Sequence, residues 1–332
     1  MSAAAEPRPH ADAAHVIRAL VRPGLEKLER TLADVAAADD PILSPMLSTV
    51  LPGSGKRLRP ALSLVIGRFG PADAEILNHM AVGVELLHTA SLVHDDVVDE
   101  SDTRRGAATL FSRVGNALAV LVGDYLFSQA ARECVATGDL RVVGLFARTL
   151  SAMAQGQVDE ANGQKQRHTW KTLSREQYYR TIWGKTASLF VLACEGSAML
   201  AGLGQRQVEA LRTYGEKIGL AFQVVDDILD FTGTEEVLGK PVGSDLRQGT
   251  ITLPVILLRD RELADGRFNQ VFELGDVEEQ VRLIQESGVV EAAYAEADHL
   301  VRTAQEALLA LPPSVERTAL QDLASFVTHR RL

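Results

Sequence analysis

Two aspartate-rich runs of one pattern, DDxxD, constrain what this chain can fold into. They are Asp95–Asp99 (DDVVD) and Asp226–Asp230 (DDILD), and each follows an apolar stretch with helical spacing, LLHTASLVH and GLAFQVV. In an α-helix the first and fifth residues of the pattern lie about one turn apart on the same face. Each run therefore predicts a helix that carries carboxylates along one stripe and apolar side chains elsewhere.

The six aspartates of these two runs would be costly to place on otherwise apolar helices without a positive partner. Carboxylate oxygens are ligands that suit Mg²⁺, which usually completes its shell with water and substrate phosphate. A solvated helix face is the alternative for a single DDxxD run. The repetition of the pattern and its apolar flanks favour a cluster of Mg²⁺ ions that is held between two helices and grips a polyphosphate.

Short basic motifs accompany the aspartate runs. They are Gly53–Pro60 (GSGKRLRP), Asp102–Gly106 (DTRRG), Gly184–Thr186 (GKT) and Gly239–Pro241 (GKP). The chain as a whole is acidic, with 34 basic and 44 acidic residues and a net charge of −10. Arginine binds phosphate through a planar fork and lysine as a point charge. Basic groups beside acidic runs therefore indicate clamps for metal-bound phosphate.

In order and content, these motifs resemble those of the trans-isoprenyl (polyprenyl) diphosphate synthases. The resemblance runs from about Leu20 to the C-terminus, and its motifs are GSGKRLRP, ELLHTASLVHDDVVDESDTRRG, GNALAVLVGDYLF, GKTASLF, AFQVVDDILDFTG and GKPVGSDLRQGTITLPVI. Three residues depart from the family pattern. Ser54 replaces a common glycine, Ala108 a frequent proline, and Thr250 a lysine that could contact phosphate, so Thr250 is not counted as a site residue.

The resemblance implies a Mg²⁺-dependent prenyltransferase. Such an enzyme condenses an allylic prenyl diphosphate with isopentenyl diphosphate by head-to-tail 1'-4 chain elongation and releases diphosphate, which is expected to accept the final proton. The resemblance also implies a homodimer and a multi-helix bundle around a central cavity. A long product is expected to partition into membranes although the chain itself would not span one.

By the resemblance, the aspartates of both runs hold three Mg²⁺ ions, with Mn²⁺ as an alternative. The expected metal ligands are Asp95, Asp99, Asp226 and Asp230. Asp96 and Asp227 complete or support the metal shells. The metals neutralise the allylic diphosphate as its C–O bond breaks.

The resemblance divides the remaining site residues between the two substrates. Those expected on the allylic diphosphate are Arg104, Lys185 and Lys240, and those expected on isopentenyl diphosphate are Lys56, Arg59, His88 and Arg105. Thr186 and Gln223 are candidates to stabilise the allylic cation through oxygen dipoles. Two alternatives stay open at this point: His88 as a core histidine and Lys185 as a surface lysine.

The remaining sequence predicts one all-α domain. Apolar residues recur at three- and four-residue spacing almost throughout, and no linker divides the chain. Asp73 and Ser174 have the features of helix N-caps. Residues 1–14 are polar and proline-bearing and are expected to be disordered, which leaves 15–332 as the single domain. GNALAVLVGDYLFSQA is apolar nearly all round, so this helix is expected to be central or at a subunit interface.

Compartment and partners are also constrained. The first residues lack a basic start followed by an apolar stretch, and no uninterrupted apolar run reaches the roughly 18 residues of a membrane span. Cys134 and Cys194 form no ligand motif and are expected to be buried thiols. These features favour a cytoplasmic protein. The acidic balance and the 5% aromatic content disfavour nucleic-acid binding.

Three other classes of function are less consistent with the sequence. A nucleotide-binding P-loop fails because Val50 occupies its first glycine position and Arg57 follows Lys56. A class I terpene cyclase also ionises a prenyl diphosphate, but the family's GKRLRP signature for a second diphosphate favours condensation. A helical scaffold whose aspartates merely bind cations would release no diphosphate.

Product length depends on the helix that carries the first aspartate run. Ala90 and Ser91 lie five and four residues before Asp95, roughly one turn or ~6 Å below the carboxylates. Family members with short products tend to carry Phe or Tyr at these positions as a floor. Because both residues are small here, we expect an all-trans product of about C30 to C50, with geranylgeranyl (C20) or farnesyl (C15) diphosphate as alternatives. Deeper residues such as Val84 or Leu87 could also close the pocket.

Overall fold

A computed structural model describes residues 13–51, 57–104, 106–165, 169–234, 241–262 and 266–328. The first half contains α1 (Ala13–Leu20), α2 (Arg22–Ala36), α3 (Leu43–Val50), α4 (Leu58–Gly67), α5 (Ala74–Val98), β1 (Thr103–Arg104), β2 (Ala107–Ala108), α6 (Leu110–Ala136) and α7 (Leu140–Lys165). The segments that follow α7 are α8 (Thr169–Thr172), α9 (Arg175–Ile182), η1 (Trp183–Ala187), α10 (Ser188–Val191), η2 (Leu192–Gly196), α11 (Ser197–Leu200) and α12 (Gln205–Thr232). The last part contains α14 (Ser244–Arg247), α15 (Leu253–Glu262), α16 (Arg267–Leu274), α17 (Val277–Glu286), α18 (Val289–Ala307), η3 (Leu308–Ala310) and α19 (Val315–Thr328).

The predicted all-α, single-domain fold is confirmed. In the described part of the chain, strands occur only in the β1–β2 hairpin that follows α5. Asp73 and Ser174 both cap helices, since their side chains accept hydrogen bonds from the backbone N–H groups of Glu75 and Gln177. Residues 1–12, which hold most of the segment expected to be disordered, lie outside the described residues, and α1 begins at Ala13.

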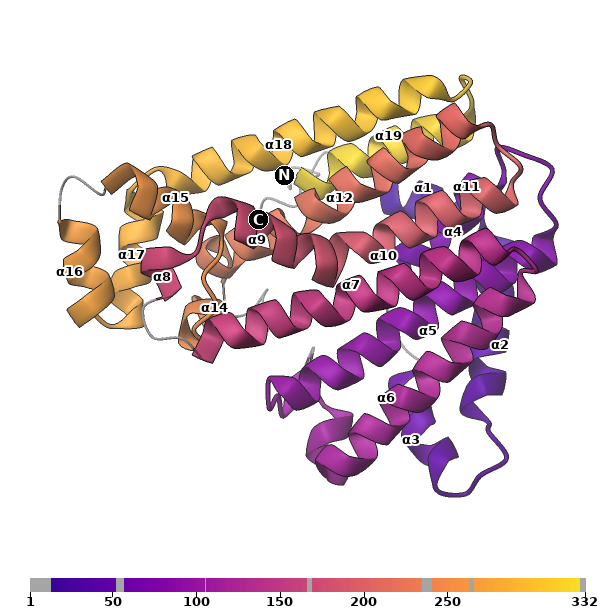
Figure 1. Ribbon diagram of the computed structural model, residues 1–332, viewed down its shortest axis with the longest axis horizontal. Helices are drawn as coiled ribbons and strands as arrows, with labels where there is room; N and C mark the ends of the chain where they lie inside the picture. Colours follow the sequence, from indigo (N-terminus) through magenta and orange to yellow (C-terminus); the bar gives the residue numbers. More distant parts are fainter. Residues whose placement is uncertain are drawn as a thin grey trace, which may run out of the picture.

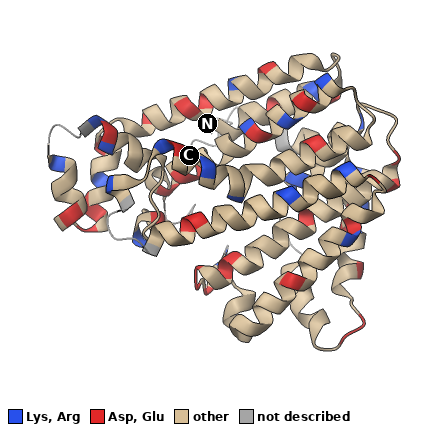
Figure 2. Ribbon diagram, in the orientation of Figure 1, with Lys and Arg blue, Asp and Glu red and all other residues tan. Residues whose placement is uncertain are grey.

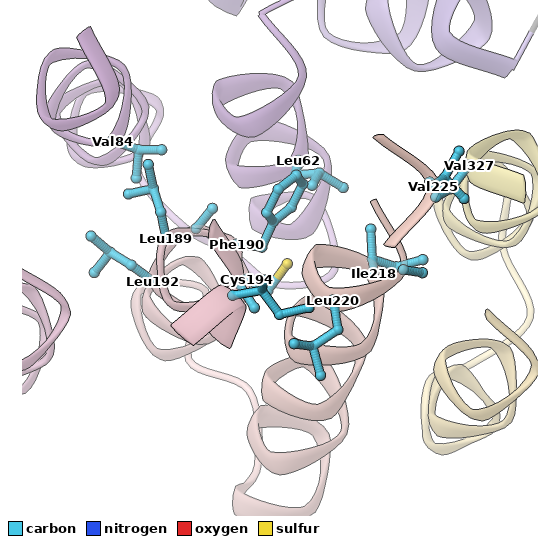
Figure 3. Packing of buried hydrophobic residues seen from close by; sticks show 14 of the residues in the cluster. Leu62, Val84, Leu189, Phe190, Leu192, Cys194, Ile218, Leu220, Val225 and Val327 are labelled. Carbon is cyan, nitrogen blue, oxygen red and sulfur yellow. The ribbon is translucent and has the colours of Figure 1, made fainter. Parts of the chain in front are cut away.

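Two long helices organise the bundle. α5 packs against α4 and α6, while α12 packs against α18, α10 and η1 (Figure 1). The core joins helices that are distant in sequence. Figure 3 shows Leu62 of α4, Phe190 of α10, Ile218 of α12 and Val327 of α19 in one apolar cluster. α5 and α12 each carry one aspartate run near the C-terminal end, so packing around these helices positions the predicted site.

The segment η1 is a π-helix wedged between α7 and α12. A Cβ atom on Gly156 of α7 would lie 2.6 Å from the backbone nitrogen of Lys185, and one on Gly219 of α12 would lie 2.5 Å from the Cα atom of Ala187. Only glycine allows such close approach on both sides. π-Helical turns are rare and occur often at functional sites. η1 contains the GKT motif, so these contacts fix its lysine and threonine relative to both neighbouring helices.

α5 and α6 are each long and apolar enough to cross a membrane by length and composition. The most apolar window of α5 is 72% buried within the protein, as in a core helix, whereas that of α6 is only 28% buried. Leu118 and Leu121 of α6 are 39% and 61% exposed. The stretch GNALAVLVGDYLFSQA was expected to form a helix that is central or at a subunit interface. This helix is not central, and it presents an apolar face at the surface.

Candidate active site

The first aspartate run lies on the last turn of α5. Asp95 and Asp99 are partly exposed, while Asp96 is buried and forms an ion pair with Arg104 of β1, with 2.8 Å between Oδ1 and Nε. Figure 2 shows acidic residues gathered at this end of the helix. The run therefore divides into two carboxylates that can receive a cation and one that holds the hairpin. Arg104, expected on the allylic diphosphate, here contacts Asp96.

The second run lies near the end of α12. Asp226 is partly exposed, whereas Asp227 and Asp230 are buried. Oδ2 of Asp230 accepts a hydrogen bond from the backbone N–H of Asp245 at 3.0 Å, and its carbonyl accepts one from Gly243. One oxygen of Asp230, which we expected to be a metal ligand, thus anchors the loop before α14. Asp226 is the partly exposed carboxylate of this run.

Lys185 connects the first run to two other helices. It lies on η1, forms an ion pair with Glu160 of α7, and interacts electrostatically with Asp95 and Asp99 of α5. Burial alone would lower the pKa of Lys185, but these three carboxylates raise it above its ordinary value. Lys185 is therefore charged and is not a plain surface lysine.

The carboxylates of α5 are costly to ionise in the metal-free protein. Burial raises the pKa of Asp95 to about 6, and the opposing effect of Lys185 is offset by Asp99 and Glu160. Burial also raises the pKa of Asp99, for which Lys185 again acts in the opposite sense. A divalent cation beside these oxygens would remove this cost. Hard oxygen donors with raised pKa values fit Mg²⁺ better than a softer metal.

The described residues contain no group of three His, Cys, Asp or Glu side chains close enough to hold one ion. The two runs thus supply separate sets of carboxylates rather than a closed cage. Mg²⁺ is usually bound through one or two carboxylates, with water and substrate phosphate as its other ligands.

A second basic site lies between α4 and α5. Nη1 of Arg59 lies 3.1 Å from Nε2 of His88, and the guanidinium lies 4.5 Å above the centre of the Phe190 ring. Arginine only donates hydrogen bonds, so Nε2 of His88 is the acceptor and its proton resides on Nδ1. Two of the four residues expected to bind isopentenyl diphosphate are thus neighbours, and the role of His88 stays a prediction.

Thr186 and Gln223, the expected cation-stabilising residues, are also neighbours. Oγ1 of Thr186 donates a hydrogen bond to Oε1 of Gln223 at 2.7 Å. Gln223 Nε2 in turn donates to Oδ1 of Asp227 at 2.8 Å, and the Tyr178 hydroxyl donates to Oδ2 at 2.6 Å. Burial raises the pKa of Asp227 well above its usual range, while these two hydrogen bonds act in the opposite sense.

Three predicted site residues cannot be placed. Lys56, Arg105 and Lys240 lie outside the described residues, and their roles stay predictions. Thr250 accepts a hydrogen bond from the Gln164 side chain at 2.9 Å, so it joins the loop after α14 to the end of α7. Ala90 is fully buried, and the hydroxyl of the partly exposed Ser91 donates to the carbonyl of His88.

Sequence reasoning missed two residues of this site, Glu160 and Tyr178. Glu160 lies in the stretch QVDEAN of α7, where nothing distinguishes it from a solvated glutamate. Tyr178 lies seven residues before Lys185, but the π-helical turn that contains Lys185 shifts the register, so this spacing alone would not have placed the tyrosine. A groove of about 800 Å³ is lined by Tyr179, Trp183 and Lys217 among others, and its lining includes none of the predicted site residues.

Comparisons with known proteins identify the family of this chain. A model of the polyprenyl synthetase family matches residues 40–286. Heptaprenyl diphosphate synthase component 2 of Geobacillus stearothermophilus is 38% identical over 284 residues, which cover 85% of this chain and 88% of that protein. A Caulobacter crescentus polyprenyl synthase, solved with calcium and isoprenyl diphosphate, has 33% identity and a TM-score of 0.88 over 96% of this chain and 98% of that one. A decaprenyl diphosphate synthase from Rhodobacter capsulatus has 34% identity and a TM-score of 0.85 over 97% and 99% of the two chains.

Proposed function

The chain belongs to the polyprenyl synthetase family, and from this premise we propose that it elongates an allylic prenyl diphosphate with isopentenyl diphosphate and releases diphosphate. One observation carries the proposal. The Asp95–Lys185 region and the Arg59–His88 pair form two separate places for an anion, about two turns apart along one face of α5. Condensation needs two diphosphates, whereas cyclisation or hydrolysis needs only one.

We assign the metal-binding role to Asp95, Asp99 and Asp226, with Asp230 as a further ligand. Three Mg²⁺ ions, or Mn²⁺ in their place, would neutralise the allylic diphosphate and favour its departure. The Caulobacter crescentus relative binds calcium together with isoprenyl diphosphate. That complex supports a divalent metal at this family's diphosphate site. Asp96 and Asp227 act indirectly, because each is already hydrogen-bonded within the protein.

The chain's own residues supply charge and orientation. Lys185 lies beside Asp95 and Asp99 and places a positive charge where the leaving diphosphate collects negative charge. Thr186 and Gln223 present oxygen dipoles to the allylic carbon as it becomes positive. Arg59 and His88 bind the uncleaved diphosphate of isopentenyl diphosphate, so that its double bond faces that carbon. Lys56, Arg105, Arg104 and Lys240 complete the two anion sites in this proposal.

A long-chain product is part of the proposal. The relatives named above include heptaprenyl and decaprenyl diphosphate synthases. Ala90 and Ser91 are small, so neither residue places an aromatic side chain one turn below Asp95. Both observations support a product of about C30 to C50, since each added isoprene unit must find space in a close-packed protein.

We also propose that a second copy of the chain covers the exposed face of α6. Val114, Ala117, Leu118, Leu121 and Tyr125 recur at three- and four-residue spacing, which is the pattern of a helix seam. The name of the Geobacillus stearothermophilus relative, component 2, indicates that the relative works with another component. Light scattering of the purified chain alone distinguishes a partner that is a second copy of the chain from a partner that is another component. Leu121→Glu is expected to dissociate the dimer, whereas Leu140→Glu, at a site that is 86% exposed outside this stripe, is not.

A cytoplasmic location completes the proposal. Cys134 and Cys194 are buried, free thiols, and burial raises the pKa of Cys134 to about 12. Such thiols are typical of a reducing compartment.

The proposed activity is tested by product analysis. The purified protein is incubated with farnesyl diphosphate, excess isopentenyl diphosphate and Mg²⁺, and diphosphate release and product mass are measured. We expect one diphosphate per added unit and products longer than C20. Asp226→Ala should reduce turnover by orders of magnitude, while Asp34→Ala, an exposed aspartate of α2, should not. A wild-type protein that released no diphosphate would refute the function, and products that ended at C15 or C20 would refute the long chain.

A further inference from the structure

A buried chain of hydrogen bonds runs from α9 through α12 to η1. The Tyr178 hydroxyl donates to Asp227 Oδ2 at 2.6 Å, Gln223 Nε2 donates to Asp227 Oδ1 at 2.8 Å, and Thr186 Oγ1 donates to Gln223 Oε1 at 2.7 Å. Tyr178, Asp227 and Thr186 are all less than 9% exposed. Gln223 and Asp227 lie four residues apart on α12 and so face the same way.

The chain of hydrogen bonds has a fixed direction. Both side-chain oxygens of Asp227 accept hydrogen bonds, so the amide NH₂ of Gln223 faces Asp227 and its carbonyl oxygen faces Thr186. The Thr186 hydroxyl has a single proton, which it uses to donate a hydrogen bond to Oε1 of Gln223. Its oxygen lone pairs are then left for a positive group bound beside η1. If the Gln223 amide turned over, the Thr186 hydroxyl would become an acceptor and its proton could point toward the substrate.

The π-helical turn η1 makes this arrangement possible. Tyr178 and Thr186 are eight residues apart, which in a continuous α-helix would leave them about 80° apart around the axis. A π-turn inserts one extra residue, so the pair takes the register of residues seven apart and returns to within about 20° of one face. Both side chains can then reach α12. The capping box of Ser174 and Gln177 fixes the first turn of α9, on which Tyr178 lies.

We infer that Tyr178 is a positioning residue for prenyl transfer, which holds Asp227 and Gln223 so that the Thr186 oxygen faces the developing allylic cation. The inference rests on the proposed function. The competing view is that Tyr178 only fills the core, which its ring would do equally well without the hydroxyl. Ring packing and hydroxyl orientation can therefore be separated by removing one oxygen atom.

Tyr179, the next residue in the sequence, offers a matched control. The hydroxyl of Tyr179 also donates to a carboxylate at 2.6 Å, that of Glu296 on α18, and the two tyrosine rings contact each other edge to face. Tyr179 lines the groove between α9, α12 and α18, whose lining includes none of the predicted metal-binding or substrate-binding residues. Tyr178→Phe and Tyr179→Phe thus remove the same chemical group from neighbouring positions that face different parts of the molecule.

The test measures steady-state kinetics, product release and thermal unfolding of the full-length variants. For Tyr178→Phe we expect kcat to fall by about ten- to one-hundred-fold, as is typical when a partner of a site residue is removed. KM for both diphosphates should stay within about two-fold, because the lost interaction acts mainly in the transition state. For Tyr179→Phe, kcat should stay within about two-fold. In a Gln223→Ala background, the further loss caused by Tyr178→Phe should shrink to less than about three-fold, because Tyr178 acts through Gln223.

Three results would overturn the inference. They are an unchanged kcat in Tyr178→Phe, a full additional loss in the Gln223→Ala background, and a Tyr178→Phe protein without a cooperative unfolding transition, which would make the hydroxyl structural. Failure of the proposed function is recognised separately, because the wild-type protein would then form no elongated product.

Discussion

Lys185 of η1 and Glu160 of α7 form an ion pair beside the carboxylates Asp95 and Asp99 of α5. The pair neutralises a lysine that the proposed reaction needs as a positive charge. A diphosphate that binds with Mg²⁺ must therefore compete with Glu160 for Lys185. Glu160 also disfavours ionisation of Asp95, because it helps to raise the pKa of that carboxyl.

We expect Glu160→Gln to lower KM for the allylic diphosphate by about three- to ten-fold, since Lys185 keeps its position but loses its charged competitor. KM for isopentenyl diphosphate, whose site includes Arg59 and His88, should not change. Initial rates at varied allylic substrate and saturating isopentenyl diphosphate measure the effect. Glu133→Gln on α6, where Glu133 pairs with His79, is the control for loss of a paired glutamate. An increased allylic KM would instead mean that Glu160 itself helps to bind metal.

Arg59 and Lys240 are expected to affect different substrates. Arg59→Ala removes the guanidinium that contacts His88 and Phe190 and should raise KM for isopentenyl diphosphate by at least about ten-fold, as expected for the loss of a charged contact. Lys240→Ala should raise KM for the allylic substrate instead. Rates measured with each substrate varied in turn give the comparison. Identical profiles for the two variants would show that the division of the basic motifs is wrong.

The aspartate runs and the all-α class could be predicted from sequence, because helical periodicity and local motifs encode them, whereas the grouping of Arg59 with His88 followed only from the family resemblance. The structural role of Arg57 could not be predicted in this way. It shares a motif with Arg59, yet it adopts a left-handed conformation (φ 46°) and its side chain is held between Glu29 of α2 and Glu85 of α5. These partners are distant in sequence, so nothing local separates a structural arginine from a ligand-binding one.

Contacts that are distant in sequence also explain why the aspartates within each run differ in role. The DDxxD pattern treats its three carboxylates alike, but Asp96 pairs with Arg104 and Asp227 with Tyr178, and both partners come from other elements. The roles within each run are decided by tertiary contacts and not by the pattern.

Asp95 should make the metal-free protein less stable at neutral pH than at acidic pH. Its pKa is about 6 in the folded protein and 3.8 in the reference state, so between these values the folded state binds more protons than the unfolded state. Its contribution to the free energy of unfolding therefore falls as pH rises from about 4 to about 6 and is constant above that range. Asp95→Asn should raise the thermal midpoint at pH 8 without Mg²⁺ and change it little at pH 4.

Mg²⁺ provides the control for this effect. Because the ion binds the ionised carboxylate, it should stabilise the wild-type protein at pH 8 more than at pH 5, and Asp95→Asn should lose most of that gain. Differential scanning calorimetry with and without Mg²⁺ measures both shifts. A metal-free Asp95→Asn protein less stable than the wild type at pH 8 would contradict the proposed cost of burying this charge.

Product length provides the final prediction. Ala90 is buried on α5 about one turn below Asp95, on the path that a growing chain would follow away from the diphosphate. Ala90→Tyr should fill that path and shorten the product sharply, because a phenol ring and an isoprene unit cannot share one volume in a close-packed interior. Mass spectrometry of products formed with excess isopentenyl diphosphate gives the length distribution. Ala81, also buried on α5, is nine residues earlier and so on the opposite face of the helix. Ala81→Tyr should lower the thermal midpoint, since overpacking a core costs about 1–3 kcal/mol, without shifting the products that remain. If Ala90→Tyr instead destabilised the protein and left product length unchanged, Ala90 would face packed core, and the product would have to grow along another face of α5.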